Sequence, residues 1–361
     1  MHDEIEKQGT DVHRYEDLIT EPPKWSKKKF NRMMWRTRMN KLKNAASAVI
    51  LLFLLYTVYI SVIHIYFNTS GVNGTFIRSI ITMVELHENG VRVERPANST
   101  IEVTPFLTQK TTLKLYRNVG DWQVITGEIR AKKGVFGELT YSFENMSTYL
   151  NKNSHTSFIL PASIMFDKPI KDIPRQEGDL EQLSKIEDGN VAELSFSTNT
   201  LVSPEHLMGL LAQYNIVVTG MPVYAGELKA FDTSHSVAGG TDYYVPYLNL
   251  RPTSGYDDNN ELSSWQLYFA AADKGKMSEH VKNLMSELEW MTTNIQYNGV
   301  NQDKERLAYL LKNEVQVYGA TVTGPVRELE KLKEQPEFRE FRLGRIEVWN
   351  WDKKYFKRPS S

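Results

Sequence analysis

The hydrophobic pattern of the chain is dominated by one apolar run, residues 45–67, which contains no Lys, Arg, Asp or Glu. At a rise of about 1.5 Å per residue, a helix over this run is long enough to cross the roughly 30 Å hydrocarbon core of a bilayer. A buried core helix is the alternative, but the length and purity of the run favour a membrane span. We therefore predict a transmembrane helix over residues 45–67.

The segment directly before this run, residues 22–44, carries basic residues and no acidic residue. By the positive-inside rule, such a flank stays in the cytoplasm and the C-terminal part of the chain lies outside. A cleaved signal peptide would have its positive segment at the very start and small residues after the apolar run, so we expect an uncleaved signal anchor. The basic residues that flank the membrane are Lys24, Lys27, Lys28, Lys29, Arg32, Arg36, Arg38, Lys41 and Lys43.

Beyond the apolar run, residues 69–74 contain Gly and Asn and predict a flexible break, which a helix over residues 76–87 follows. Apolar and polar residues then alternate in short stretches, as they do in half-buried antiparallel strands. We expect these strands to form a small sheet and define residues 68–175 as a β-rich subdomain. The predicted strands cover residues 101–103, 111–115, 122–129 and 139–143.

The last part of the chain repeats the order strand, helix, strand. In the first unit, Ser203-Pro204 supplies a helix cap and a proline for the first turn. Two such units on one sheet predict an α+β domain with a mixed or antiparallel sheet over residues 176–361. The units cover residues 191–197, 207–214 and 216–219, then 314–323, 324–333 and 343–351, and two further helices are predicted over 277–293 and 302–312.

Residues 1–44 form a tail of two opposite charge blocks, because residues 1–21 are rich in Asp and Glu and residues 22–44 are basic. One interpretation is a basic amphipathic approach to the bilayer, held by anionic lipid and by tryptophan at the interface. The other is that both blocks wrap around a cytosolic partner, and the two are compatible. The bulky anchors for such a partner would be Tyr15, Leu18, Ile19, Trp25, Phe30 and Trp35.

The amino-acid composition excludes several kinds of functional site. The 361 residues include no cysteine, which excludes disulfides, thiolate catalysis and Cys-based zinc sites. An external domain of this size without disulfides favours a bacterial protein, in which the Asn-x-Ser/Thr triplets carry no meaning. Residues 68–361 have a net charge of −5, so the external part does not offer a nucleic-acid-binding surface.

No motif points to catalysis: the sequence has no Gly-x-Ser-x-Gly, Walker loop or His-Glu-x-x-His. Weak candidates are Ser154-His155 with His206 as a nucleophile and base, and residues 257–261 as oxygen ligands for calcium, but surface histidines and a solvated loop explain them better. A groove for a peptide or glycan, or equally packing in the core and strands, explains the aromatic residues Tyr243, Tyr244, Tyr247, Tyr256 and Trp265. We expect no enzyme activity, no metal and no cofactor, and therefore a sensor or a scaffold.

Two external passages resemble the C-terminal domain of the sigma-factor-regulator family. They are AELSFSTNTLVSPEHLMGLLAQYNIVVTGMPVYAGE (Ala192 to Glu227) and VQVYGATVTGPVRELEKL (Val315 to Leu332). The tail and its membrane helix are similar to the N-terminal part of that family. The resemblance implies a membrane-bound anti-sigma factor whose tail holds an extracytoplasmic-function sigma factor away from RNA polymerase. It also implies release on an envelope stress signal, with a second small membrane protein as a further partner.

The chain departs from the zinc-bearing anti-sigma type, which needs a His and two Cys in its tail, so binding would depend on the charged and aromatic groups of residues 1–44. The expected location is the bacterial cell membrane, with a single pass, the N-terminus in the cytoplasm and the C-terminus outside. The alternative is a membrane-tethered envelope enzyme or binding module whose tail only orients it, and a third possibility is a structural member of an envelope complex.

Overall fold

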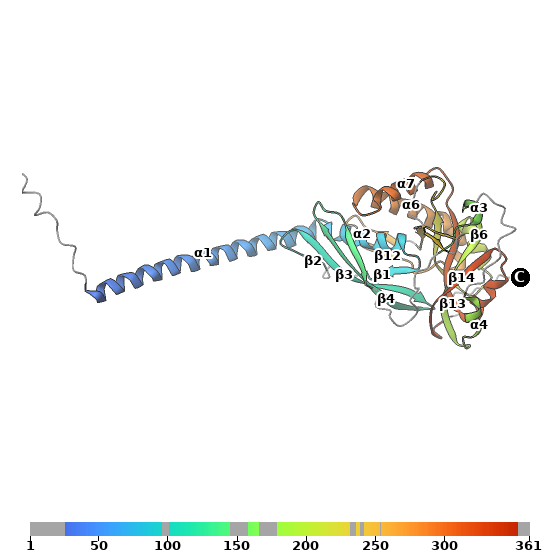
Figure 1. Cartoon of the computed structure of the whole chain (residues 1–361), viewed down its shortest axis with the longest axis horizontal. Coiled ribbons are helices and arrows are strands. Elements are labelled where there is room, and N and C mark those ends of the chain that lie inside the picture. Colours follow the sequence, from blue (N-terminus) through green and yellow to red (C-terminus); the bar gives the residue numbers. More distant parts are fainter. Residues whose placement is uncertain are drawn as a thin grey trace, which may run out of the picture. The chain divides into compact units, whose positions relative to one another are not determined.

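The computed structural model describes residues 26–95, 101–144, 158–165, 179–231, 236–238, 242–252 and 254–352 (Figure 1). The chain divides into two compact units, Met1–Val62 and Ile63–Ser361. The four anchor residues before Ser26, together with Ser154-His155, lie outside the described residues.

The first long helix, α1, covers Lys27–Thr69 without interruption. It contains neither proline nor glycine, so nothing in its sequence breaks the helix between the basic segment and the apolar run. Most of its apolar side chains are exposed in the structure, for example Leu52 with 66% of its surface accessible, whereas Ile63 and Phe67 near its C-terminal end are buried. Within the described residues, α1 is the one helix long and apolar enough to cross a membrane by its length and composition.

The second helix, α2, covers Val72–His87 and starts directly after Gly71, which has φ 70°. The predicted flexible break is therefore wrong at Asn73 and Gly74, which lie buried in the first turn of α2. A Cβ atom on Gly74 would collide with the carbonyl oxygen of Asn259, so this glycine allows a loop from elsewhere in the chain to approach the helix. The predicted helix over residues 76–87 is confirmed.

The first sheet is antiparallel and follows the order β1-β3-β4-β5, with β2 paired to the outer part of β3. In its long hairpin of β3 and β4, buried residues alternate with more exposed ones over residues 108–117 of β3 and 126–132 of β4, as half-buried strands do. The strands are β1 (Val91–Val93), β2 (Glu102–Val103), β3 (Thr108–Val119), β4 (Trp122–Gly134) and β5 (Thr140–Glu144).

The second sheet is also antiparallel and follows the order β10-β7-β13-β6-β14. The two predicted strand-helix-strand units both contribute to it, which confirms an α+β arrangement with an antiparallel sheet. The first unit consists of β6 (Asn190–Val202), α5 (Pro204–Leu211) and β7 (Val217–Tyr224), and the second of β13 (Gln316–Pro325), α8 (Val326–Glu330) and β14 (Phe338–Val348). The edge strand β10 covers Leu248–Leu250.

The remaining elements surround these two sheets. Helices α6 (Met277–Asn294) and α7 (Val300–Leu310) confirm the two predicted helices, and α6 packs against both α2 and β10. The smaller elements are α3 (Ala162–Met165), α4 (Leu180–Ser184), the paired strands β8 (Ser236–Ala238) and β9 (Asp242–Tyr244), and the paired strands β11 (Ser254–Tyr256) and β12 (Leu262–Trp265).

One hydrophobic core connects α2, the inner face of the first sheet and the second sheet. Ile80 and Ile81 of α2, Leu113 of β3, and Leu194 and Val322 of the second sheet belong to the same buried cluster. Burial of such side chains is the main driving force for folding. The predicted division into subdomains at residue 175 stays a prediction, although residues 63–361 form one compact unit.

Candidate functional site

The predicted partner-binding residues that the structure describes, Phe30 and Trp35, lie on the N-terminal part of α1. Both side chains are exposed, with 50% and 64% of their surface accessible. The other four, Tyr15, Leu18, Ile19 and Trp25, lie outside the described residues. All eight flanking basic residues from Lys27 to Lys43 belong to α1 and are exposed, so this helical segment presents a cationic surface with aromatic side chains.

The C-terminal end of α2 carries a carboxylate in the middle of the core. Glu85 is fully buried, and its Oε2 lies 2.9 Å from Nη1 of Arg92 and 2.9 Å from Nη1 of Arg251. Its Oε1 lies 2.8 Å from Nη2 of Arg95 and accepts the backbone N–H of Val93 at 3.1 Å. Burial alone would raise the pKa of Glu85, but the three guanidinium groups and the backbone donor outweigh it and hold the pKa at about 2.

Further arginines and a second carboxylate extend this arrangement toward α6. Nη2 of Arg251 lies 2.7 Å from Oε2 of Glu287, whose pKa burial raises. The guanidinium carbon of Arg78 lies 4.5 Å from the ring centroid of Tyr256 and 3.9 Å from that of Trp290, a cation–π arrangement on two rings. We call the group Arg78, Glu85, Arg92, Arg95, Arg251 and Glu287 the α2 charge cluster.

The last residue of α2 is held by a second set of charges. Nε2 of His87 lies 3.0 Å from Oδ2 of Asp303 in α7, while Nδ1 lies 2.8 Å from the carbonyl oxygen of Met83. Burial lowers the pKa of His87, but Asp303 and the carbonyl of Met83 outweigh it, so the net shift is upward. Asp303 also pairs with Arg306 at 2.7 Å, and Nε of Arg306 lies 3.0 Å from Oε1 of Glu227.

These charges fix α2 to β1, β10, α6 and α7. Removing one partner from a buried ion pair typically costs about 3–5 kcal/mol, because the other charge is left without compensation. Any displacement of α2 from its site must therefore break several buried ion pairs together. Since α2 begins three residues after α1 ends, these ion pairs hold in the domain the helix that directly follows α1.

The sequence search missed this feature, although one signal was present. The apolar side of the predicted helix over residues 76–87 includes Glu85 along with Ile80, Ile81 and Val84. A carboxylate on an apolar helix face is a sign of a buried partner. The three arginines that pair with Glu85 are brought to it by the tertiary structure, so their spacing along the chain did not reveal them.

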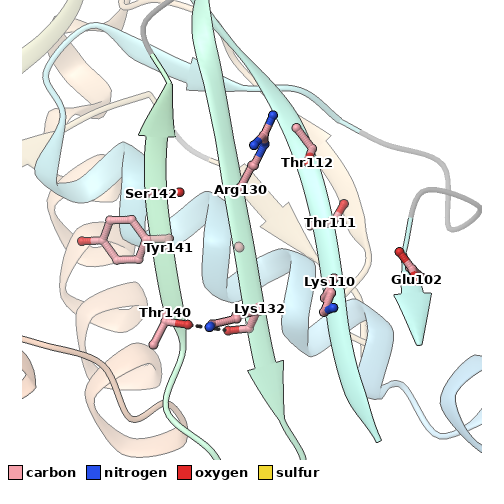
Figure 2. A pocket seen from close by; sticks show the side chains of 10 residues that line it. Glu102, Lys110, Thr111, Thr112, Arg130, Lys132, Thr140, Tyr141 and Ser142 are labelled. Atoms are coloured by element: carbon pink, nitrogen blue, oxygen red, sulfur yellow. Dashed lines mark hydrogen bonds between the residues drawn. The ribbon is translucent and has the colours of Figure 1, made fainter. Parts of the chain in front are cut away.

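The exposed face of the first sheet has an open depression of about 770 Å³. Lys110 of β3 lies directly opposite Lys132 of β4, and Arg130 lies two residues before Lys132 on β4 (Figure 2). Like charges in such cross-strand positions repel each other, and here only part of the charge is offset, since Arg130 pairs with Glu144 at 2.7 Å. The lining residues are Glu102, Lys110, Thr111, Thr112, Arg130, Ala131, Lys132, Thr140, Tyr141 and Ser142.

The residues considered as calcium ligands form a turn. Oδ1 of Asp257 accepts the backbone N–H groups of Asn259 and Glu261 at 2.9 and 2.8 Å. The side chain of Asn260 accepts a hydrogen bond from Arg78 at 2.6 Å and donates one to Thr75 at 3.0 Å, so this loop contacts α2. Among the described residues, no group of three His, Asp or Glu side chains is arranged to hold a metal ion.

The other weak candidates have structural roles where the structure describes them. The backbone N–H of His206 donates to Oγ of Ser203 at 3.2 Å, which caps α5. Tyr247 packs on Phe158 with ring centroids 5.4 Å apart, and Tyr256 contacts Arg78. Trp265 is exposed, whereas the side chains of Tyr243 and Tyr244 lie outside the described set.

The sequence of residues 183–345 matches the family model described as sigma factor regulator C-terminal. This range runs from the end of α4 into β14 and includes both strand-helix-strand units. It also contains the two passages that carry the resemblance. The match therefore confirms the resemblance to the sigma-factor-regulator family.

A curated relative is the probable anti-sigma-M factor YhdL of Bacillus subtilis (strain 168), 35% identical over 75 residues. The aligned part covers 21% of this chain and 19% of the relative, so the chain spans about a fifth of the length of the curated relative that it matches. No solved structure gives a significant match. These findings show that residues 183–345 are similar to the C-terminal domain of sigma factor regulators, and that a short stretch of the chain is similar to part of a probable anti-sigma factor.

Proposed function

We propose that the chain is a membrane-bound anti-sigma factor. In this proposal, residues 1–44 lie in the cytoplasm and bind an extracytoplasmic-function sigma factor, which is thereby kept away from RNA polymerase. Residues 45–67 cross the cell membrane once, and the remaining residues lie outside. Under this arrangement the protein acts as a negative regulator of transcription without enzymatic activity.

The observation that carries the proposal is the sigma factor regulator domain on the same chain as α1. The domain is supported by the match over residues 183–345, and α1 joins a cationic, aromatic-bearing segment to a helix long and apolar enough to cross a membrane. The positive-inside rule places the basic flank in the cytoplasm. A sigma factor can be reached only from that side.

Partner binding is assigned to the charge blocks of residues 1–44 and to their bulky side chains. Charged groups give orientation and specificity, while a few aromatic anchors supply most of the binding energy at such interfaces. Phe30 and Trp35 are exposed on α1, which leaves them accessible to a partner.

Release of the sigma factor requires that a signal at the external domain reaches the tail. The α2 charge cluster and the His87–Asp303 pair support a mechanical route, because they fix α2 to the domain and α2 follows α1 after three residues. We propose that a signal or a second small membrane protein bound to the domain shifts this connection. Anionic lipid at the basic flank completes the set of proposed partners.

The test replaces Tyr15, Leu18, Ile19, Trp25, Phe30 and Trp35 by alanine in the full chain and follows a reporter controlled by the target sigma factor. The reporter signal should rise, while the amount of protein in the membrane stays constant. A matched control replaces the polar residues Asn31, Thr37 and Asn40 by alanine, since they lie on the same part of α1. Equal reporter signals from both variants would contradict the proposal.

A second candidate function, a membrane-tethered envelope binding module, is favoured by the depression on the first sheet. Its lysines, arginine and hydroxyl groups suit a polar or anionic ligand. This candidate predicts that a ligand binds the external part and that alanine changes in residues 1–44 leave the reporter unchanged. The same experiment therefore separates the two functions.

A further inference from the structure

Two phenylalanines stand at the tips of tight turns in the first sheet. Phe106 lies in the turn between β2 and β3, where the N–H of Leu107 donates to the carbonyl of Thr104 at 3.0 Å. Phe136 lies in the turn between β4 and β5. Their exposed fractions are 90% and 102%, so water surrounds both rings completely.

Phenylalanine is an unusual residue at such turn positions. Gly, Pro, Asn, Asp and Ser dominate turn positions because they fit the backbone and hydrogen-bond locally, whereas a phenylalanine at a tip gains nothing from the fold. Large apolar side chains that are exposed together mark a surface for a partner or a membrane. Val135, beside Phe136, is also exposed, which adds to the apolar surface of the second tip.

The two tips lie at the same end of the sheet. Thr108, the first residue of β3, is paired with Gly134, the last residue of β4, so the turns before β3 and after β4 are neighbours. The next residue of β3, Gln109, donates from Nε2 to Oδ1 of Asn73 at 2.7 Å. This end of the sheet is therefore the end at which α2 begins, three residues after α1 ends at Thr69.

We propose that Phe106 and Phe136 insert into the interfacial region of the bilayer that α1 crosses. The inference rests on the proposed membrane span of residues 45–67. Given that span, Thr69 leaves the bilayer at its outer surface, and the contact between Gln109 and Asn73 holds the two tips close to that surface. Two separate protruding side chains suit a deformable lipid interface, which closes around each of them, better than the flat surface of a second protein.

The charges next to the tips suit lipid headgroups of negative charge. Lys110, Lys132 and Lys133 lie within two residues of the paired ends of β3 and β4, and Glu102 and Glu138 are the acidic residues of the strands and turns that carry the tips. Each lysine near an anionic membrane adds to its attraction, and these three lysines stand beside the tips themselves, whereas the exposed acidic residues Asp257, Asp258 and Glu261 lie in the loop that contacts the start of α2. With the tips inserted, the external domain has contacts with the membrane beside α1, which fixes its orientation on the bilayer.

The chain contains no cysteine, so single cysteines can carry a fluorescent label at chosen positions. Full chains with Phe106→Cys or Phe136→Cys, each keeping the other phenylalanine, are labelled with a nitrobenzoxadiazole dye and reconstituted into vesicles of phosphatidylglycerol and phosphatidylcholine. The matched control is Trp122→Cys, an exposed aromatic position at the opposite end of the β3–β4 hairpin. Quenching by aqueous iodide and by lipids that carry a nitroxide is then compared.

We expect labels at 106 and 136 to be quenched several-fold less by iodide, and several-fold more by the nitroxide lipids, than the label at 122. Equal quenching at all three positions overturns the inference. A fourth variant, Leu52→Cys in the apolar run, reports on the span itself. If the label at 52 is shielded from iodide while the labels at 106 and 136 are not, the insertion of the tips is wrong but the membrane span is not. If iodide reaches the label at 52, the proposed membrane span is wrong, and the inference that rests on it is wrong as well.

Discussion

Replacing Glu85 by glutamine keeps the size of the side chain and removes only its charge. In the structure this carboxylate lies within 2.9 Å of three guanidinium groups and is fully buried. The variant therefore leaves Arg92, Arg95 and Arg251 together in the core with Glu287 as the remaining carboxylate of the α2 charge cluster.

The size of the effect follows from the pKa. The folded protein holds the pKa of Glu85 at about 2, compared with its ordinary value of 4.5. At about 1.4 kcal/mol per pKa unit, the charged form contributes about 3 kcal/mol to the free energy of unfolding at neutral pH. The typical cost of breaking a buried ion pair, about 3–5 kcal/mol, agrees with this value.

The assay is thermal unfolding of the full chain in detergent, followed by near-ultraviolet circular dichroism of its tryptophans. A loss of about 3 kcal/mol corresponds to a melting temperature roughly 5–10 °C lower for a unit of this size. The control is Glu144→Gln, which also removes a carboxylate from an arginine pair, but from one that is exposed on both sides. Exposed pairs contribute little, so this control should melt close to the unmodified protein.

The pH dependence provides a second readout with a definite sign. Because the folded pKa of Glu85 is depressed, its contribution is present above pH 4.5 and is lost as the pH falls toward about 2. The difference between the unmodified protein and the Glu85→Gln variant should therefore shrink as the solution is acidified. If Glu85→Gln melts as high as Glu144→Gln at neutral pH, the account of the α2 charge cluster is wrong.

Two further predictions concern α2. Gly74→Ala should lower the free energy of unfolding by about 1–3 kcal/mol, measured by urea unfolding, because the new methyl group meets the carbonyl of Asn259. Gly275→Ala, with no atom near its Cβ position, is the control, and equal unfolding midpoints would refute the packing argument. His87→Gln tests the ion pair between His87 and Asp303. Because the folded protein raises the pKa of His87, protonated His87 stabilises the fold below pH 6.5. This stabilisation is lost as the pH rises through the pKa of His87 in the folded protein. The unmodified protein should therefore lose more thermal stability between about pH 6 and about pH 9 than His87→Gln does, and parallel pH curves would count against the pair.

Much of the fold could be predicted because local signals agree with the final structure. Ser203-Pro204 caps and starts α5 as predicted, and the alternation in residues 111–115 and 122–129 continues through the longer strands β3 and β4. The repeated order of strand, helix and strand predicted that both units share one mixed or antiparallel sheet, and in the structure that sheet is antiparallel.

The errors arise where tertiary contacts override local preference. Asn73 and Gly74 have the composition of a turn, but contacts with Gln109 and with the loop at Asn259 hold them in a helix. The strand predicted from residue 343 begins at Phe338, because the pairing of β14 with β6 shifts twice in register and so hides the alternation.

The candidate site was predicted less completely than the fold. The exposed positions of Phe30 and Trp35 agree with a binding role but do not test it. The α2 charge cluster joins residues 78–95 with Arg251 and Glu287, which are more than 150 residues further along the chain. Only the three-dimensional fold brings them together, so the sequence offered no spacing from which the cluster could be recognised.

The most direct test of the central claim is to purify the full chain from bacterial membranes in mild detergent and identify bound proteins by mass spectrometry. A chain that lacks residues 1–44 but keeps the apolar run serves as the comparison. The proposed function predicts that a sigma factor of the extracytoplasmic-function class accompanies the full chain and is lost from the shortened one. A full chain that carries no sigma factor, or one that the shortened chain retains equally, would contradict it.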